Sequence, residues 1–470
     1  MGAVMFVGRK NELVSIRNAL LTPGSAVMIY GKRKVGKTTL IKEALQNENY
    51  ISVYYECIKG SLEENISLLT QELVRTGILP AMLAFQSFQD LFSYLDSLAK
   101  HIVIIIDEYP YLKVANEGKL VDSIFQSIID NRLKNLNLIL SGSHVGMMRE
   151  MLGEDNSLYG RFHTVIRLGE LSYLEASAFY PDKTAYEKAG FFCVFGGSPY
   201  INEQLNPHFS LRENILNTVL NTGSAISLYA ENLLISDFKN RLNAERIFAC
   251  LGNGKKRYGE LEKALKLDRT GNLNRQLKIL TDMQIITRNN PINKSDDTKK
   301  TMYSIDDNLL RFYYSFIYKN KSALQMLGAE AFYAEYIEPR LTEFISRRFE
   351  DIGRTYFSLL AKNGKLQGAR NIGALYYDDP VNKKNGEFDV AIEYSDGYDI
   401  IEVKYYREKL GLGEMKKEAA QVVSIPDLSV RNIGFISANG FEDTDNFKPC
   451  LSAVDLYDES LLCVMKNQVS

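Results

Sequence analysis

An octapeptide near the start of the chain has the residue types and spacing of a phosphate-binding loop. Residues 31–38 read GKRKVGKT, which fits the pattern G-x-x-x-x-G-K-[ST], and they follow the apolar run of residues 26–30. Glycines at 31 and 36 allow positive φ angles, with which successive backbone N–H groups turn toward an anion. Residues 39–45 then read as a helix whose N-terminal end adds to the attraction. The pattern indicates a site for a nucleoside triphosphate, with a basic strand-to-helix turn as the alternative.

Each residue type in this loop has an expected task. The ammonium of Lys37 should reach the β- and γ-phosphates of ATP, and the hydroxyl of Thr38 should bind Mg²⁺. The residues expected to bind the nucleotide from this segment are Gly31, Lys32, Arg33, Lys34, Val35, Gly36, Lys37, Thr38 and Thr39.

A second signal for phosphate chemistry is an apolar run that ends in two acids. Residues 101–108 read HIVIIIDE, as expected of a buried parallel strand that delivers carboxylates to the carboxyl edge of its sheet. Asp107 is the expected Mg²⁺ partner, and Glu108 is placed to orient and polarise the attacking water. Ser143, after another apolar run, could sense the γ-phosphate; a polar strand-end turn is the equal alternative.

The third cluster is a hairpin in the last third of the chain. Two runs of alternating polarity between residues 387 and 405 flank an Asp-Gly turn signal at 396–397. A two-residue turn pairs Asp389 directly with Lys404, and Glu402 then projects from the same face. Two such carboxylates can hold a divalent metal, and the ammonium can stabilise charge developing on a phosphate. The alternative is a half-exposed hairpin with one weak Asp389–Lys404 ion pair.

Five strand-like apolar runs alternate with helical patterns over the first 200 residues. They lie at residues 27–30, 51–55, 102–106, 136–141 and 164–168. This alternation predicts a parallel sheet with helices on both faces, whose carboxyl edge positions the loop and the two acids.

The middle third reads as three short amphipathic helices, at residues 246–251, 258–265 and 273–280, and two strands, at 285–288 and 301–305. The pattern resembles a winged-helix unit with residues 289–300 as its wing loop. Its basic residues make it the most plausible DNA-facing segment, because such clusters release counterions from phosphates. They are Lys255, Lys256, Arg257, Arg269, Arg275, Lys278, Lys299 and Lys300. A packing and signalling module with solvated charges is the equal alternative.

Taken in order, the motifs of the first 200 residues resemble those of the archaeal-type ATPases, AAA-like relatives of the signal-transducing STAND NTPases. The resemblance rests on residues 6–13, 31–38, 104–108, 140–148, 158–161, 171–172 and 196–200. It implies that Phe6, Val7 and Gly8 lie near the adenine and that Ser143 is the sensor. It also implies that Arg161 addresses the γ-phosphate of its own chain or of a neighbour, with a surface arginine as the alternative.

The last third is similar to the PD-(D/E)xK nucleases, in which an aspartate precedes an E-x-K motif as Asp389 precedes Glu402-x-Lys404. The resemblance implies a C-terminal domain of restriction-endonuclease-like fold in which Asp389 and Glu402 bind Mg²⁺. Glu350 matches the first-helix acid of such nucleases and would be a further metal ligand, and Gln421 could face the site. Domains of this kind can keep the fold and lose turnover, so cleavage stays open.

Composition sets the outer limits. With 470 residues, 45% of them hydrophobic and 24% charged, the chain is globular and long enough for about three domains. A net charge of −2 excludes a uniformly basic nucleic-acid binder. Five scattered cysteines argue against a disulfide framework and favour a reducing cytoplasm. No apolar segment approaches the roughly 20 residues that span a bilayer, so no membrane contact is expected.

We therefore expect an α/β protein with a P-loop ATPase domain at residues 1–205, a helical lid and winged-helix domain at 206–320, and a nuclease-like α/β domain at 321–470. The favoured function is an ATPase whose nucleotide state controls Mg²⁺-dependent cleavage of nucleic acid, with defence against foreign DNA as one setting. The rival is an ATP-dependent DNA-binding or signalling switch with a silent nuclease-like domain, and a nucleic-acid motor is the third hypothesis. A homo-oligomer is expected if Arg161 acts on a neighbour.

Overall fold

The chain forms two compact units. The computed structural model describes residues 6–46, 50–232, 241–265, 272–379, 384–458 and 460, so the predicted DNA-facing Arg269 and the cysteine at 463 lie outside the described residues. The first unit holds Met1–Leu171, Ser198–Tyr200 and Lys278–Gln284; the second holds Ser172–Gly197, Ile201–Leu277 and Ile285–Ser470.

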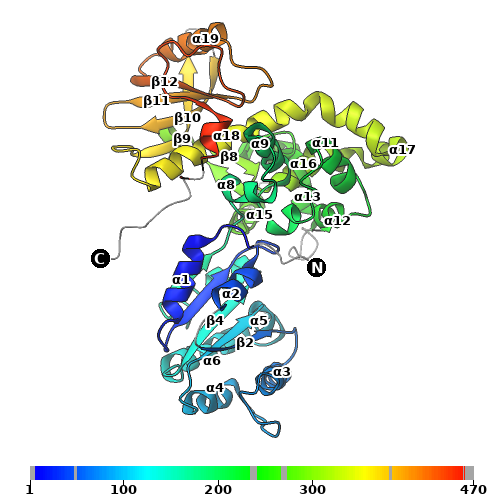
Figure 1. Ribbon diagram of the computed structural model, residues 1–470, viewed down its shortest axis with the longest axis vertical. Coiled ribbons are helices and arrows are strands. Elements are labelled where there is room, and N and C mark those ends of the chain that lie inside the picture. The colour runs from blue at the N-terminus through cyan, green and yellow to red at the C-terminus, as the bar shows by residue number, and fades with distance from the viewer. Residues whose placement is uncertain are drawn as a thin grey trace. The chain divides into compact units, whose positions relative to one another are not determined.

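The first unit is built on a five-stranded parallel sheet with strand order β2-β3-β4-β1-β5 (Figure 1). Its strands are β1 (Ala26–Tyr30), β2 (Ile51–Glu56), β3 (Ile102–Asp107), β4 (Leu136–Gly142) and β5 (Thr164–Arg167). Its helices are α1 (Lys10–Leu20), α2 (Lys37–Ala44), α3 (Leu62–Arg75), α4 (Phe88–Ser97), α5 (Pro110–Ala115), α6 (Gly118–Asn131) and α7 (Val145–Glu150). All five predicted strands and the α/β class are confirmed.

Burial on both faces explains why the central strands are continuous apolar runs. β1, β3 and β4 are buried at every residue. One face of the sheet packs against α3, α4 and α6, and the other against α1 and α2. Because the strands are parallel, the carboxyl ends of β1, β3 and β4 meet at one edge. That edge carries the phosphate loop, the two acids and the serine.

Helices dominate the middle of the chain. They are α8 (Tyr173–Ala176), α9 (Ala185–Phe195), α10 (Pro199–Asn202), α11 (Leu211–Asn214), α12 (Ala225–Asn232), α13 (Arg241–Leu251), α14 (Tyr258–Leu265), α15 (Asn272–Asp282), α16 (Asn308–Phe312), α17 (Lys321–Phe332) and α18 (Glu338–Lys362). Segment Ser172–Gly197, which the expected boundary at 205 assigns to the ATPase domain, packs with the second unit. Its helix α9 contacts α16 and α18 and buries Phe191, Val194 and Phe195.

The predicted winged-helix region contains α13, α14 and α15 with a small antiparallel sheet of order β6-β8-β7. The strands are β6 (Lys256–Arg257), β7 (Ile286–Asn289) and β8 (Met302–Ile305). The two expected strands are thus present, and β6 is an additional one. A short 3-10 helix, Ile292–Lys294, interrupts the loop between β7 and β8 and packs against the C-terminal sheet.

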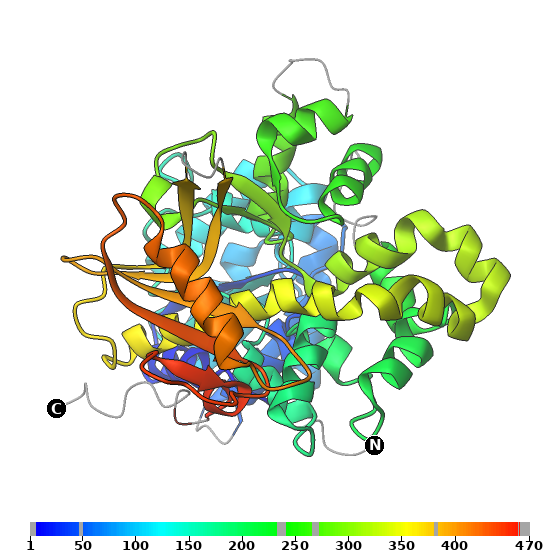
Figure 2. The same ribbon diagram turned by 90° about the horizontal axis from the view of Figure 1, so that it is seen from above.

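The C-terminal part of the second unit is a five-stranded mixed sheet of order β13-β12-β11-β10-β9. Its elements are β9 (Asn371–Asp379), β10 (Lys384–Glu393), β11 (Tyr398–Lys404), α19 (Leu412–Val423), β12 (Val430–Ser437), β13 (Cys450–Ser452) and α20 (Ala453–Leu456). β9, β10 and β11 are antiparallel neighbours, and β11, β12 and β13 are parallel. α18 packs on β9, β10 and β11, and α19, orange in Figure 2, packs on β12. In the described part of the chain, no helix combines the length and apolarity that crossing a membrane requires.

The hairpin between β10 and β11 forms, but its predicted register is wrong by two residues. Val390 pairs with Ile401, so the turn contains four residues rather than two. This register carries Glu402, and not Lys404, opposite Asp389. Because the shift is an even number of residues, the three polar side chains keep their common face.

The reason for the error is the glycine of the turn. A two-residue Asp-Gly turn needs positive φ at both positions, and of the two only Gly397 has it, at 145°. Gly397 serves instead a close approach, since a Cβ there would lie 2.4 Å from the carbonyl oxygen of Ser429. The Asp-Gly pair at 396–397 therefore does not mark a two-residue turn. Its glycine is needed because the segment before β12 packs closely against it.

Candidate active sites

The phosphate loop owes its shape to two left-handed residues and one close approach. Lys34 has φ 68° and Gly36 has φ 90°. The expected positive φ at Gly31 is wrong: glycine is needed there because a Cβ would lie 2.0 Å from the carbonyl oxygen of Leu168, a backbone atom that cannot swing aside. Residues 37–39 form the first turn of α2, whose N–H groups have no partner within the helix and are available to an anion.

Lys37 lies over the loop, where it is expected to meet the phosphates. Its Nζ donates hydrogen bonds to the carbonyl oxygens of Gly31, at 2.9 Å, and Lys32, at 3.1 Å. Lys37 is 7% exposed, so its charge needs acceptors close by. Phosphate oxygens are stronger acceptors than carbonyls, and the same ammonium can exchange one set for the other.

The two residues expected to hold Mg²⁺ meet at the sheet edge. Thr38 Oγ1 donates to Asp107 Oδ2 at 3.0 Å, and the same oxygen accepts from the hydroxyl of Tyr54 on β2. The other carboxylate oxygen accepts from the N–H of Glu108 at 2.9 Å. Burial, and then the contact with Asp107, raises the pKa of Tyr54, which keeps that hydroxyl a donor. A hydroxyl and an oriented carboxylate are the oxygen ligands that Mg²⁺ takes.

Glu108 is held by the end of the neighbouring strand. Its Oε2 accepts from the N–H of Ser143 at 3.2 Å and from the Ser143 hydroxyl at 2.8 Å. Glu108 also has φ 49°, a left-handed conformation that costs a non-glycine residue roughly 1–2 kcal/mol. Strain of this kind gathers at functional sites. The structure thus brings together the predicted water-orienting acid and the predicted sensor.

The basic side chains of the loop contact groups around it. Lys32 forms an ion pair with Glu170 at 2.5 Å, and Arg33 donates to the hydroxyl of Tyr111 at 3.3 Å. These contacts hold the first half of the loop.

The second half of the loop meets the segment at 198–200. The ammonium of Lys34 lies 4.0 Å from the centroid of the Tyr200 ring, and its carbonyl oxygen accepts from Ser198 Oγ at 3.1 Å. Val35 is buried. The motif near residue 200 is therefore part of the loop's support.

The N-terminal motif adds a residue that sequence reasoning did not single out. Phe6 packs against the core beside α1, and Val7 is half-buried. Gly8 and Arg9 both have left-handed φ, at 70° and 61°. The Arg9 guanidinium donates to the carbonyl oxygen of Val35 at 3.3 Å, so it braces the loop directly.

Arg161 lies at the amino ends of the strands, whereas the loop lies at their carboxyl ends. It precedes β5, in which Thr164 pairs with Val27 at the start of β1, whereas the loop follows the end of β1. Its Nε donates to both carboxylate oxygens of Asp130, at 2.9 and 3.1 Å. A strand of this length spans roughly 16 Å, so the structure does not bring Arg161 to the loop of its own unit.

The predicted nuclease residues come together in the second unit. Asp389 Oδ2 accepts from the N–H of Val403 at 2.9 Å, and the register carries Glu402 opposite it. Lys404 Nζ lies 3.7 Å from Glu402 Oε2 and 3.1 Å from Glu418 Oε1. Glu418, on α19, was missed because only the fold brings that helix to β11.

Glu350 and Gln421 flank this group from the two helices. The Arg354 guanidinium lies 3.8 Å from Glu350 Oε2 and donates to the carbonyl oxygen of Asp389, which ties α18 to β10. Gln421 Nε2 donates to the hydroxyl of Tyr377 at 2.7 Å. Glu350 therefore lies beside the acids as predicted, and Gln421 contacts the edge strand β9.

Burial and mutual repulsion keep these acids from ionising easily. Burial, followed by the charge of Asp389, raises the pKa of Glu402 to about 9 and that of Glu350 to about 7. Burial also raises the pKa of Asp389. Among the residues that the structure describes, no three His, Cys, Asp or Glu side chains are grouped so as to hold a metal ion.

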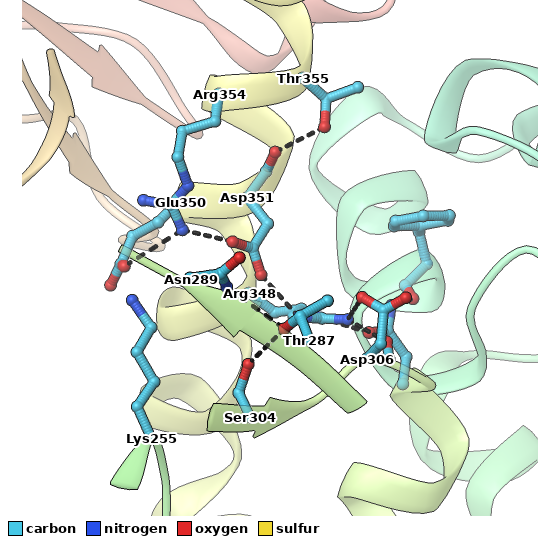
Figure 3. A network of polar contacts seen from close by, with 12 residues as sticks. Lys255, Thr287, Asn289, Ser304, Asp306, Arg348, Glu350, Asp351, Arg354 and Thr355 are labelled. Atoms are coloured by element: carbon cyan, nitrogen blue, oxygen red, sulfur yellow. Dashed lines mark hydrogen bonds and ion pairs between the residues drawn. The ribbon is translucent and has the colours of Figure 1, made fainter. Parts of the chain in front are cut away.

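An ion network around the buried Arg348 joins α18 to the middle of the chain (Figure 3). Arg348 Nη1 lies 2.6 Å from Asp351 Oδ2, and its guanidinium also donates to the Asn308 side chain and the Asp306 carbonyl. The other oxygen of Asp351 pairs with Arg354. Burial raises the pKa of Asp351, but the two guanidinium groups outweigh it and hold that pKa well below its usual range.

Two of the predicted DNA-facing lysines point at the C-terminal sheet. Lys255 Nζ lies 3.6 Å from Glu387 Oε2, and Figure 3 shows the ammonium directed at Glu350. The ammonium of Lys300 lies 3.7 Å from the centroid of the Tyr376 ring. Three other members of the predicted set are exposed, namely Arg275, Lys278 and Lys299.

Comparison with known proteins identifies two domains. Residues 6–200 match a family described as an ATPase domain predominantly from Archaea, and residues 313–421 match a family described as archaeal and bacterial proteins of unknown function. An uncharacterised protein of Methanocaldococcus jannaschii is 28% identical over 367 residues, which cover 77% of this chain and 79% of that protein. An uncharacterised ATP-binding protein of the same organism is 46% identical over 48 residues, 10% of this chain and 81% of that protein.

A solved structure shares the fold. The Walker-type ATPase of Pyrococcus abyssi superimposes with a TM-score of 0.51 and 18% identity, covering 66% of this chain and 96% of that one. The two family matches assign residues 6–200 to an archaeal-type ATPase domain and residues 313–421 to a domain of the second family. The protein is an ATPase, as its loop and acids predict.

Proposed function

We propose that ATP binding and hydrolysis in the first unit control metal-dependent cleavage of nucleic acid by the second. The observation that carries this proposal is the group of Asp389, Glu402 and Lys404, which meet although they come from two strands. Two carboxylates on one face can hold a divalent metal and an ammonium beside them can stabilise charge developing on a phosphate, which suits hydrolysis of a phosphodiester. Defence against foreign DNA is the setting that we favour for such an activity.

We infer that a divalent cation would take two side-chain ligands in each unit. In the first unit, Thr38 and Asp107 would hold Mg²⁺ against the phosphates while Glu108 orients water. In the second, Asp389 and Glu402 would hold the metal, because two buried like charges are relieved by a cation between them. The metal would polarise the phosphate and its attacking water. Lys404 stays protonated beside them, because the charges of Glu402 and Glu418 outweigh its own burial and raise its pKa.

A second candidate is an ATP-dependent switch that binds DNA without cutting it. It is favoured by the 3.1 Å ion pair that engages Lys404 with Glu418, since an ammonium in this pair is less available to a phosphate. In this candidate the same acids have only a structural part.

Plasmid nicking separates the two candidates. Purified full-length protein is incubated with supercoiled plasmid, ATP and Mg²⁺ or Mn²⁺, and nicked and linear products are quantified. Removing an ammonium that stabilises developing charge costs about 100-fold in rate, so we expect Lys404→Ala to lose that much. In Lys37→Ala, adding ATP should no longer change the rate of nicking, because the loop no longer binds the triphosphate.

The matched control is Lys409→Ala, which removes the same charge from an exposed position in the loop after β11. It should nick like the wild type. Intact plasmid in every condition, together with ATP-dependent binding of DNA, would reject the nuclease and leave the switch.

A further inference from the structure

Lys255 reaches the C-terminal acids from the segment between α13 and β6. Glycines set the path of this segment: a Cβ on Gly252 would lie 2.5 Å from the carbonyl oxygen of Tyr314, and Gly254 has φ 113°. The Gly252 carbonyl also accepts from Ser315 Oγ at 2.6 Å. β6 begins at the next residue and pairs with β8, so the backbone is fixed on both sides of Lys255.

The wing loop fastens the same region to the edge strand β9. Asn293 Nδ2 donates to the carbonyl of Tyr376 at 2.7 Å, and its Oδ1 accepts from the N–H of Tyr376 at 3.1 Å. This pair of bonds imitates a neighbouring strand and covers the edge. Gly373 lets Ile292 approach, since a Cβ there would lie 2.7 Å from the isoleucine side chain. The small sheet and the C-terminal sheet are therefore held in a defined relation by side chains at two places.

Lys255 is the most exposed of three cations beside the acids. The side chains of Lys255, Lys404 and Arg354 are 30%, 18% and 16% exposed. Lys404 and Arg354 each form a shorter ion pair than the 3.6 Å pair between Lys255 and Glu387. Burial, followed by the charge of Asp389, raises the pKa of Glu350, and the charge of Lys255 opposes that rise, so Lys255 acts electrically on the acid that flanks Asp389.

We propose that Lys255 binds a backbone phosphate of duplex DNA at the Asp389–Glu402 site, so that the winged-helix region supplies one residue of a composite site. The inference rests on the proposed function. A polyanion that approaches buried acids is repelled unless an exposed cation lies beside them. An ammonium on a flexible stem suits this position, because it can leave a long ion pair for a phosphate oxygen.

Binding of DNA tests the proposal without requiring cleavage. The full-length protein is titrated against a fluorescent DNA duplex with Ca²⁺ in place of Mg²⁺, at several salt concentrations, and anisotropy is recorded. We expect Lys255→Ala to bind about tenfold more weakly and to reduce the slope of log affinity against log salt by about one, the signature of one lost phosphate contact. Lys263→Ala, which removes an exposed charge from α14 of the same region, should keep both values.

A second variant separates a phosphate contact from a structural role. Glu387→Gln removes the ion-pair partner and leaves the ammonium in place, so its affinity should equal or exceed that of the wild type. The proposal is overturned by an unchanged affinity and slope in Lys255→Ala, by an equal loss in Glu387→Gln, or by a wild type that does not bind the duplex. Failure of the proposed function would look different: plasmid stays intact with Mg²⁺ while the Lys255 effect on binding persists.

Discussion

The acid at position 402 is buried in its strand and lies near two other negative groups. Burial comes first among the causes of its raised pKa, and the charge of Asp389 comes second. Its folded-state pKa of about 9 exceeds the ordinary value of 4.5, so the folded protein holds this proton more tightly than the unfolded chain does. The stabilising contribution of Glu402 is therefore full below about pH 4.5 and is lost as the pH rises toward 9.

This sign gives a prediction for the carboxamide variant in metal-free buffer. The carboxamide of Glu402→Gln cannot ionise, so at pH 9 the free energy of unfolding of the second unit should be higher in this variant than in the wild type. The difference should be at least about 1.4 kcal/mol, the equivalent of one pKa unit. At pH 5 the difference should vanish, because Glu402 is then protonated. Urea unfolding at pH 5, 7 and 9 measures this difference, with Glu393→Gln on the neighbouring strand β10 as the control. A gain at pH 5 as large as at pH 9 would contradict the assignment.

Among the elements, α18 contacts several parts of the second unit through two of its arginines. Through Arg348 it contacts Asp306 and the first residue of α16, Asn308, and through Arg354 it contacts β10. Arg348 and Asp351 are both held within this network. A buried charge that loses its partner is costly, so the network makes the helix intolerant of change at these positions.

Neighbouring arginines on α18 provide a matched test. Arg348→Ala should lower the unfolding free energy by about 3 kcal/mol, because it leaves buried acceptors without a donor. Arg347→Ala should cost less than about 1 kcal/mol, because Arg347 is 50% exposed and forms an ion pair with the exposed Glu343 on the same helix. Chemical denaturation of the two variants and the wild type measures both. Similar losses in the two would show that Arg348 is not anchored as described.

The strands of the first sheet could be predicted because each is an apolar run that ends where polar residues or glycine follow. The runs at residues 102–106 and 136–141 became β3 and β4 within a residue or two. For the C-terminal site, the sequence predicted which residues share a face but not which residues pair. The alternation of side chains places Asp389, Glu402 and Lys404 on one face, whereas the length of the turn sets the register between the strands. The partners Tyr54 and Glu418 escaped, because a contact between non-adjacent elements leaves no local pattern.

For the molecule as a whole, strand order decides where Arg161 can act. The register of β5 on β1 places it at the edge away from its own loop. If this arginine addresses a γ-phosphate, the phosphate belongs to a second copy, and ATP should promote assembly.

Mixing two inactive variants tests this arrangement. Lys37→Ala removes the phosphate-binding ammonium of the loop, and Arg161→Ala removes the arginine. A mixture of the two variants should recover part of the ATPase activity, because some assemblies then place an intact loop beside an intact arginine of another subunit. Turnover is measured against mixing ratio. Arg75→Ala, an exposed arginine on α3, should hydrolyse ATP normally. Full activity of Arg161→Ala by itself would remove the arginine from catalysis.

Helix α9 belongs by packing to the second unit, although the ATPase family match continues past it to residue 200. α9 buries Phe191, Val194 and Phe195, and it packs against α16 and α18, which lie more than a hundred residues further along the chain. A fragment cut after residue 205 would display these apolar side chains to water and invite aggregation. Nascent chains face the same exposure during synthesis, so the first unit emerges from the ribosome carrying a helix whose cover has yet to be translated.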